Sequence, residues 1–445
     1  MKISSYKDNM AGEKMYKESY YNYFLEIDEV PVLVNLRTGA IAEVKRENVQ
    51  KIKEILKGNI VDEELFEQLK YGGYIVEEGY NEYEEIKMRN YKARFDNSKA
   101  MFTIIPTFQC NFDCIYCYET KRNKIMTIEK AEEIADYIIN ISKNKKTISI
   151  GWFGGEPLMN FKVIEHINMK IIGESEAELF SSMSSNGYLL NYIDVSKFDE
   201  LKIKNVQITL DGIEETHNKY RPLIGGGKTF DKIIKGIEKL FENTEKTNVS
   251  IRVNVGPENY DKIEELFEYL EKFPKERMKI YFRWIFQASE KNKDFHVHVR
   301  DFRKENSFTK LSKLYEMAIN RGYKVMLPIL NGDMYCEFDN VYNMVIGPEG
   351  EIYPCTVAVE EGMEMGKIEN GKIKLETKKH LKWHSHNGYE DKNCKECKIL
   401  PLCHGGCRNA ALNGNRGCPE EKRETESFIK LWYKVKKFEK KMVVR

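Results

Sequence analysis

The sequence predicts an α/β protein in which a parallel sheet lies between a small N-terminal domain and a cysteine-rich C-terminal region. Strand-like and helix-like segments alternate between residues 99 and 330. A shorter series of strands, helices and a strand precedes them, and it contains no cysteine. Seven of the 10 cysteines lie after residue 331. We therefore divide the chain into residues 1–98, 99–330 and 331–445.

Composition excludes two broad classes of function. The 71 Lys and Arg residues nearly balance the 70 Asp and Glu residues, and a net charge of +1 provides no general attraction to nucleic acid. No apolar run is long enough to span a bilayer, and the first residues lack the apolar stretch of a signal peptide. We therefore expect a cytoplasmic protein whose grouped cysteines bind metal or take part in redox chemistry, because cytoplasmic thiols stay reduced.

Residues 1–98 predict a winged-helix-like domain. Residues 23–44 have the pattern of a β-hairpin or meander, with a turn near Thr38 and Gly39. Apolar residues at helical spacing in 47–58 and 62–73 predict two helices, and 74–76 predict a strand. Such domains bind peptides or nucleic acid, and the alternative is a domain that only packs against its neighbours.

The region 99–330 predicts repeated βα units. The expected strands are 101–108, 147–154, 181–187, 206–212, 250–256 and 279–286, and the expected helices begin at Thr127, Thr229 and Ile263. Such units form a parallel sheet, open or barrel-like, that binds ligands at the carboxyl ends of its strands. Further on, His296 and His298 alternate as they would on a strand, and we expect neither to bind a metal.

Three cysteines follow the first of these strands at the spacing C-x3-C-x2-C: Cys110, Cys114 and Cys117. Thiolates select zinc or iron–sulfur clusters, and structural zinc needs four ligands. A triple on a loop suits a cubane cluster with one iron left open. The alternative is that these are core or zinc-binding cysteines. Gly154, Gly155 and Glu156 follow the second strand, and Ser185 and Asn186 follow the third; glycines let a ligand approach the backbone, and Glu156 offers a carboxylate to an ammonium group.

With these motifs the chain resembles the radical S-adenosylmethionine (radical SAM) enzymes, over residues 99–330. The resemblance rests on CNFDCIYC, GGEP, SSNG, ITLDG and RVNV, in this order. It implies a partial (β/α)6 barrel and a 4Fe–4S cluster held by Cys110, Cys114 and Cys117, whose open iron binds the amino and carboxylate groups of S-adenosylmethionine. It further implies cofactor contacts from Tyr116 to the adenine, from Gly154, Gly155 and Glu156 to the methionyl group, from Ser185 or Asn186 to the ribose, and from Arg252 to the carboxylate.

The seven later cysteines are similar in spacing to a SPASM domain, which follows some radical SAM enzymes. This resemblance implies two auxiliary 4Fe–4S clusters, a proximal one on Cys336, Cys355 and Cys407 and a distal one on Cys394, Cys397, Cys403 and Cys418. Two zinc sites are the alternative, but seven thiols divide poorly into two sites of four. By the same count, one iron of the proximal cluster has no cysteine ligand. Water, a carboxylate such as Asp333, or a substrate thiolate would bind that iron. We expect His404 to lie beside the ligands or at the surface.

The resemblance implies a maturase of ribosomally made peptides. Residues 1–98 would bind the leader of the precursor peptide and do no chemistry, and a flavodoxin or ferredoxin would donate the low-potential electron. The bond formed is expected to be a thioether, with a carbon–carbon crosslink as an alternative. An anaerobic sulfatase maturase is a second alternative, although that family has an acidic residue where this chain has Thr356. A non-catalytic electron carrier is a third, but a carrier has no use for a cofactor pocket.

Overall fold

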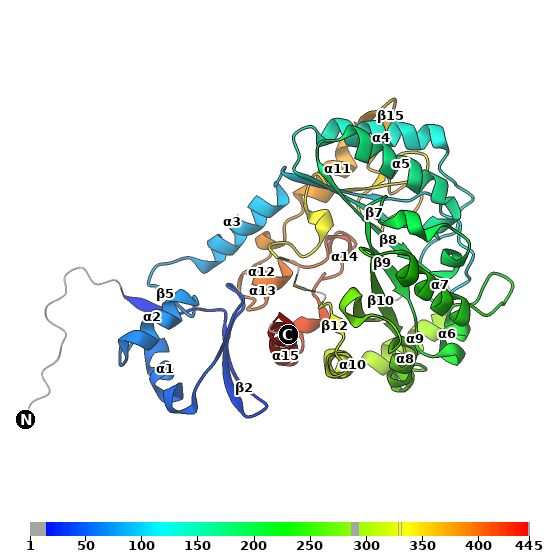
Figure 1. Cartoon of the computed structure of the whole chain (residues 1–445). Coiled ribbons are helices and arrows are strands. Elements are labelled where there is room, and N and C mark those ends of the chain that lie inside the picture. The colour runs from blue at the N-terminus through cyan, green and yellow to red at the C-terminus, as the bar shows by residue number, and fades with distance from the viewer. Residues whose placement is uncertain (1–14, 286–292, 328, 331, 444–445) are drawn as a thin grey trace, which may run out of the picture. The chain divides into compact units, whose positions relative to one another are not determined.

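The computed structural model describes residues 15–285, 293–327, 329–330 and 332–443, and its chain divides into two compact units (Figure 1). The N-terminal unit comprises the residues up to Lys92, the short segment that ends at Tyr335, and Gly388–Gly405. The barrel unit comprises Ala93–Leu330, Cys336–Asn387 and the chain from Gly406 onward. These units therefore do not coincide with three consecutive ranges, and the functional division into 1–98, 99–330 and 331–445 remains a prediction.

The N-terminal unit contains two small antiparallel sheets and short helices. The first sheet pairs β1 (Tyr16–Glu18) with β5 (Ile75–Glu77), and the second has the order β2 (Asn22–Ile27), β3 (Val30–Asn35), β4 (Ala40–Glu43). The helices are α1 (Val49–Leu56), α2 (Glu63–Tyr71), the start of α3 (Glu82–Arg94), α12 (Lys392–Lys395) and α13 (Leu400–Cys403). The predicted meander, its turn, the first two helices and the strand at 75 are confirmed.

The predicted apolar face of α1 forms the core of this unit. Ile52, Ile55 and Leu56 are buried against Leu33 of the central strand and Phe66 of α2. The side chain of Asp62 accepts a hydrogen bond from the amide of Leu65 at 3.1 Å, which caps α2 as its position predicts. The sequence did not indicate α3, because EYEEIKMRNYKAR lacks an apolar stripe at helical spacing.

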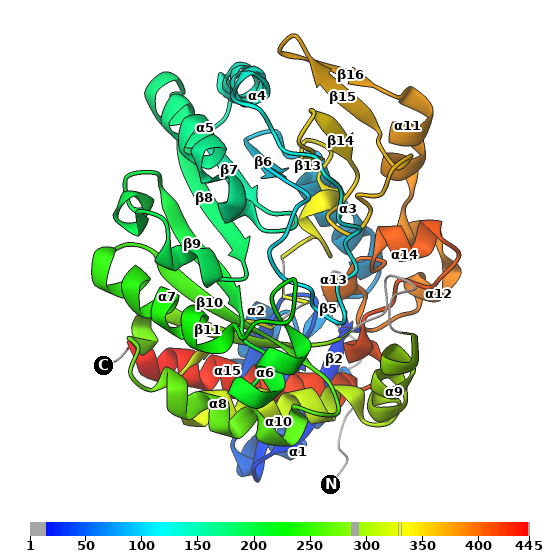
Figure 2. The same cartoon turned by 90° about the vertical axis from the view of Figure 1, so that its right-hand side faces the viewer.

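The barrel unit is built on an 11-stranded sheet in the order β12-β11-β10-β9-β8-β7-β6-β13-β14-β15-β16. Strands β6 to β11 are parallel neighbours in chain order (Figure 2). The strands are β6 (Lys99–Ile104), β7 (Thr147–Trp152), β8 (Glu178–Ser185), β9 (Ile203–Thr209), β10 (Asn248–Val255), β11 (Met278–Trp284), β12 (Lys324–Val325), β13 (Met344–Ile346), β14 (Glu351–Tyr353), β15 (Gly366–Glu369) and β16 (Lys372–Leu375). All six predicted strands are present, and they form the predicted parallel sheet; the expected end of the last strand, at residue 286, lies outside the described residues.

Helices α4, α5 and α7 cover the same face of this sheet (Figures 1 and 2). The helices of this unit are α4 (Ile128–Ser142), α5 (Phe161–Glu174), α6 (Glu214–Tyr220), α7 (Phe230–Asn243), α8 (Ile263–Leu270), α9 (Lys293–Arg303), α10 (Ser307–Asn320), α11 (Thr377–Ser385), α14 (Arg408–Leu412) and α15 (Thr425–Val443). The three predicted helices are confirmed, and Thr127 caps α4 by accepting from the amide of Lys130 at 3.2 Å.

The expected strand at His296 and His298 is wrong, because both residues lie in α9. Phe295 and Val299, four residues apart, pack on one side of this helix against Tyr220 and Ile285. This helical spacing of the apolar residues outweighs the apparent alternation of the histidines. Within the part of the chain that the structure describes, no helix combines the length and apolar character needed to cross a membrane.

Candidate active site

The motifs of the barrel unit gather where its parallel strands end. The cysteine loop follows β6, Gly154 follows β7, and Asn186 follows β8 at the same edge of the sheet. Asp211 follows β9, and Asn254 lies at the end of β10. The strand register therefore brings together residues that lie up to 144 positions apart in the chain.

Backbone hydrogen bonds fix the shape of the cysteine loop. The amide of Asp113 donates to the carbonyl of Pro222 at 2.8 Å, and the amide of Ile115 donates to Tyr220 at 3.0 Å. The amide of Cys117 donates to the carbonyl of Cys114 at 3.2 Å and closes a turn between these two cysteines. The loop thus has a defined backbone shape from the protein alone, anchored on the last residue of α6 (Glu214–Tyr220) and on the segment that follows it.

The thiols of this loop are shielded from water. Burial raises the pKa of Cys114 to about 11 and is also the largest of the effects that raise the pKa of Cys110 to about 12. Cys110 and Cys114 lie close enough for their charges to repel, as do Cys114 and Cys117. One buried thiol, Cys114, and two partly buried ones are costly as thiolates without a positive partner, and a metal cluster supplies one.

The two glycines after β7 place the backbone against the cysteine loop. A Cβ atom on Gly155 would lie 2.2 Å from the carbonyl oxygen of Gln109, and one on Gly154, whose φ is +112°, would lie 2.6 Å from that of Thr107. In return, the amide of Glu156 donates to the carbonyl of Gln109 at 2.8 Å. No side chain fits at either glycine, so the close approach requires glycine.

Glu156 is fully buried and accepts hydrogen bonds from neutral donors. Ser185 Oγ lies 2.8 Å and the amide of Leu158 3.1 Å from Oε1, and the amide of Asn186 lies 2.7 Å from Oε2. Burial is stronger than these bonds and raises the pKa of Glu156 from 4.5 to about 7. A cation bound here would favour the carboxylate, so the carboxylate is suited to an ammonium group of a ligand.

This carboxylate predicts a pH dependence of stability in the metal-free chain. Because the pKa of Glu156 is higher folded than unfolded, the folded chain binds its proton more tightly. The free energy of unfolding should therefore fall as the pH rises from 4.5 to about 7, by at most about 3 kcal/mol. Urea unfolding of wild type and Glu156→Gln across this range isolates the effect: the fall should be smaller in the variant, and identical pH dependence would contradict it.

Tyr116 belongs to a buried polar network that the motifs did not reveal. Its hydroxyl donates to Asp211, and it accepts from Arg221 Nη1 at 2.7 Å and from Asn254 Nδ2 at 3.0 Å. The amide of Asn254 also donates to Asp211 Oδ1 at 2.8 Å. Burial raises the pKa of Asp211, against the opposing effect of Arg221. Arg252 joins the network through its Nε, 2.8 Å from Asn254 Oδ1.

Charged atoms beside the cysteine loop lack partners among the described residues. Arg221 Nε and Glu119 Oε2 are buried and form no hydrogen bond there. Burial raises the pKa of Glu119 to about 7, in the same way as for Glu156. We call the two glycines Gly154 and Gly155, with Glu156, the cradle. The guanidinium of Arg221 and the carboxylates of Glu119 and Glu156 fit a ligand that carries both an ammonium and a carboxylate, as S-adenosylmethionine does.

Across the described part of the chain, no three or more His, Cys, Asp or Glu side chains converge on the position of one metal ion. A cubane cluster makes a different demand, because each of its thiolates binds a separate iron. All ten cysteines lie among the described residues and form no disulfide. A loop of three thiols that do not converge on a point therefore fits a cluster better than a zinc ion.

The barrel unit also brings together Cys336, Cys355 and Cys407. Burial is the largest cause that raises the pKa of Cys336 and of Cys355. The charge of Cys355 adds to the shift at Cys336, and the charge of Cys407 adds to the shift at Cys355. Asp339 Oδ2 accepts from the amide of Cys336 at 3.2 Å, and its Oδ1 pairs at 3.0 Å with Arg408, which follows Cys407. This buried ion pair ties two of the three cysteines together.

This second cysteine group shares a hydrophobic core with the chain that leads into the first. Phe108, two residues before Cys110, packs edge-on against Tyr353, two residues before Cys355, with ring centroids 6.4 Å apart. Arg122 stacks on the ring of Phe108 at 3.8 Å and donates to the carbonyl of Val359. The two groups therefore flank one packed region of the barrel unit.

The other predicted ligands divide between the units. Cys394, Cys397 and Cys403 lie in the N-terminal unit, and Cys418 is exposed in the barrel unit. His404 is buried rather than at the surface. Both of its ring nitrogens have protein partners, the hydroxyl of Tyr389 at 2.7 Å and the carbonyl of Gly332 at 3.1 Å. Asp333, a candidate for the open iron, has its Oδ1 paired with Arg89.

Comparison with known proteins places this site in a family. Residues 104–270 match the radical SAM superfamily. An uncharacterized protein of Methanocaldococcus jannaschii is 30% identical over 273 residues, which span 60% of this chain and 89% of that protein. The radical SAM cyclopropyl synthase TigE of Paramaledivibacter caminithermalis is 23% identical, spanning 90% of this chain and 91% of that protein. A cysteine-type anaerobic sulfatase-maturating enzyme of Clostridium novyi is 27% identical, spanning 67% of this chain and 85% of that protein.

Two solved structures share the fold. The structure of anSMEcpe with bound AdoMet and Cp18Cys peptide has a TM-score of 0.56 at 21% identity and covers 76% of this chain and 96% of its own. The structure of Streptococcus suis SuiB bound to precursor peptide SuiA has a TM-score of 0.51 at 15% identity. The match covers 91% of this chain and 98% of the SuiB chain. The cysteine loop, the cradle at the ends of the parallel strands and these matches lead to one conclusion: the chain belongs to the radical SAM superfamily of enzymes.

Proposed function

We propose that this chain is a maturase that abstracts a hydrogen atom from a ribosomally made precursor peptide and installs a crosslink, which we infer to be a thioether. The observation that carries the proposal is that the part of the N-terminal unit before Lys92 contains no cysteine and packs a core of its own, in the same chain as the radical SAM site. TigE and SuiB match about nine tenths of this chain. The sulfatase-maturating relative leaves a third of it unmatched.

The residues of the candidate active site have defined roles in this proposal. Cys110, Cys114 and Cys117 hold a 4Fe–4S cluster, and Glu156 accepts the ammonium of S-adenosylmethionine. Ser185 or Asn186 contacts the ribose, Tyr116 the adenine, and Arg252 the carboxylate; Gly154 and Gly155 leave room for the methionyl group. The bound cofactor supplies a carbon radical that removes hydrogen from an unactivated C–H bond. A flavodoxin or ferredoxin is the proposed source of the electron that its cleavage consumes.

Thioether formation sets the requirements for the second cysteine group. A C–H bond and an S–H bond of the peptide break, and a C–S bond forms. One hydrogen leaves as an atom and becomes part of 5′-deoxyadenosine, the thiol hydrogen leaves as a proton, and one electron remains. Auxiliary 4Fe–4S clusters held by the later cysteines would accept that electron. A position without a cysteine on the proximal cluster of Cys336, Cys355 and Cys407 would bind the substrate thiolate.

Two other reactions compete with the thioether. A carbon–carbon bond is favoured by the likeness to TigE, a cyclopropyl synthase, over nearly the whole chain. Formylglycine formation is favoured by the likeness to the sulfatase-maturating enzyme. The latter is the weaker of the two here, because Thr356 stands where that family has its acidic base.

A product analysis separates the three. The iron-reconstituted protein is incubated without oxygen with S-adenosylmethionine, dithionite and a synthetic cysteine-containing candidate precursor peptide. A thioether should remove two hydrogen atoms from the peptide together with one alkylatable thiol. A carbon–carbon bond would remove two hydrogens and no thiol, and formylglycine would replace a thiol by a carbonyl oxygen. An unchanged peptide, with abundant 5′-deoxyadenosine, would contradict the proposal for this peptide as substrate.

A further inference from the structure

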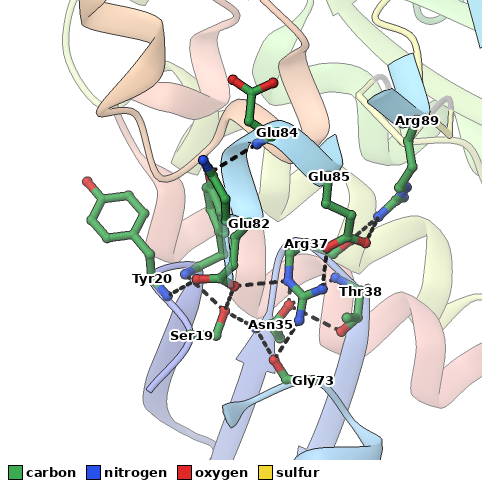
Figure 3. Close-up of polar contacts among 12 residues, drawn as sticks. Ser19, Tyr20, Asn35, Arg37, Thr38, Gly73, Glu82, Glu84, Glu85 and Arg89 are labelled. Carbon is green, nitrogen blue, oxygen red and sulfur yellow. Dashed lines mark hydrogen bonds and ion pairs between the residues drawn. The ribbon is translucent and has the colours of Figure 1, made fainter. Parts of the chain in front are cut away.

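A buried ion-pair network joins the sheets of the N-terminal unit to helix α3 (Figure 3). Arg37, in the turn after β3, has 7% of its side chain exposed and pairs with Glu82 at 2.9 Å and Glu85 at 2.6 Å. Glu82 also accepts from Ser19 and from the amide of Tyr20 at 2.9 Å. The first turns of α3 are therefore bonded to the turn before β2 and to the turn after β3.

Arg89, one turn further along α3, extends this network to the segment before Cys336. Its Nε and Nη2 donate to Asp333 Oδ1 at 2.9 and 2.5 Å, and its Nη1 donates to the carbonyl of Arg37 at 2.8 Å. The side chain of Asn90 donates to the carbonyl of Asp333 at 2.7 Å. Helix α3 thus holds Asp333 by both its side chain and its backbone.

The same helix reaches the Cys394–Cys403 segment through Tyr83. The hydroxyl of Tyr83 donates to the carbonyl of Tyr389, and the hydroxyl of Tyr389 bonds to His404 Nδ1 at 2.7 Å. His404 Nε2 meets the carbonyl of Gly332, next to Asp333, at 3.1 Å. Both ends of the cysteine segment are therefore tied to α3 and to the residues that α3 holds.

The middle of the segment is fastened to the start of β2. The hydroxyl of Tyr20 donates to the carbonyl of Glu396 at 2.8 Å. Lys398 donates to the carbonyl of Asn22 at 3.3 Å, and its ammonium lies over the rings of Tyr20 and Tyr23 at 5.5 and 5.2 Å. Glu396 and Lys398 flank Cys397, so the N-terminal unit contacts the chain on both sides of this thiol.

We propose that the N-terminal unit positions Cys394, Cys397 and Cys403 for iron–sulfur binding, with Arg89 and Tyr83 of α3 as the principal positioning residues. The segment cannot hold its own shape, because α12 and α13 have four residues each and such helices are unstable alone. The region expected to recognise a peptide and the auxiliary cysteines are then parts of one folding unit. This inference rests on the iron–sulfur assignment of these cysteines and not on the identity of the substrate.

Three full-length variants test it. Arg89→Met removes the bonds to Asp333 and Arg37, and Tyr83→Phe removes only a hydroxyl that bonds to Tyr389. The matched control is Lys87→Met on the same helix. Among the described residues, Lys87 forms an ion pair with Glu84 alone, at 3.5 Å, and it lies over the ring of Tyr91. Amide hydrogen exchange of residues 388–405 is measured in the metal-free chains, and iron and sulfide are counted after reconstitution.

Exchange in this segment should be about five- to tenfold faster in Arg89→Met and about fivefold faster in Tyr83→Phe, and unchanged in Lys87→Met. The first two variants should also lose the iron and sulfide of one cluster and keep those of the others. Wild-type exchange and full iron content in Arg89→Met and Tyr83→Phe would overturn the proposal. Equal losses in Lys87→Met would overturn it as well, because they would reflect the stability of α3 alone.

Discussion

Replacing Cys110, Cys114 and Cys117 together by alanine is expected to abolish formation of 5′-deoxyadenosine from S-adenosylmethionine. The three thiols are the proposed ligands of the cluster. The bonds from the amides of Asp113, Ile115 and Cys117 that shape their loop are main-chain bonds, and two thiols add weaker contacts, Cys110 Sγ with the amide of Phe112 at 3.4 Å and Cys117 Sγ with the carbonyl of Glu119 at 3.9 Å. The variant should therefore fold and yet bind no radical SAM cluster. Liquid chromatography of the reaction with dithionite measures the product, and circular dichroism checks the fold.

The control for this variant removes thiols elsewhere. Cys394 and Cys397 lie in the N-terminal unit, so their double alanine variant should lose auxiliary iron and still form 5′-deoxyadenosine. Retained cleavage in a folded, reconstituted variant of the loop cysteines would show that the cofactor is cleaved elsewhere.

Gly155→Ala is expected to reduce both cluster loading and cofactor cleavage. The added Cβ would lie 2.2 Å from the carbonyl oxygen and 2.5 Å from the carbonyl carbon of Gln109, which are backbone atoms that cannot rotate away. The residue that precedes Cys110 must move, which costs about 1–3 kcal/mol and displaces Cys110, the first of the proposed ligands. Cleavage should fall about 10- to 100-fold, as expected for a displacement of the order of 1 Å at a catalytic centre.

Gly151→Ala is the matched control for this substitution. Its Cβ would meet only Thr103 Oγ1 at 3.5 Å and Ser182 Oγ at 3.9 Å, both ordinary contacts, within the strand that leads to Gly155. Iron content and cleavage should remain close to wild type. If Gly155→Ala matched Gly151→Ala in both measurements, the close approach of this glycine to the cysteine loop would not govern cluster binding.

The parallel sheet was predictable because each of its strands carries a local apolar pattern and ends at a recognisable motif. The cysteine loop, Gly155 and Glu156 were found for the same reason. Asp211 lies in the motif ITLDG, but the sequence indicated no role for it, because its partners come from other strands and loops. No sequence pattern indicated that Arg221 belongs to the site, since it lies in a loop and contacts Tyr116 only through the tertiary fold.

The packing of residues 388–405 could not be predicted from the sequence. These residues form only very short helices, and their contacts with Tyr20 and Tyr83 span more than 300 positions of the chain. The sequence suggested that residues 1–98 are a separate recognition domain. A truncation near Lys99 would not isolate recognition from chemistry, because it would also remove the residues that pack against the auxiliary cysteines.

Transfer of deuterium from a peptide carbon to 5′-deoxyadenosine tests the central claim most directly. A candidate precursor peptide that the enzyme modifies is made with deuterated amino acids, and its exchangeable positions are returned to hydrogen. The peptide is then incubated with the reconstituted enzyme, dithionite and S-adenosylmethionine. The radical site at Cys110, Cys114 and Cys117 should abstract from the peptide, so deuterium should appear in 5′-deoxyadenosine in step with peptide modification. Modified peptide accompanied by 5′-deoxyadenosine free of deuterium would contradict the account.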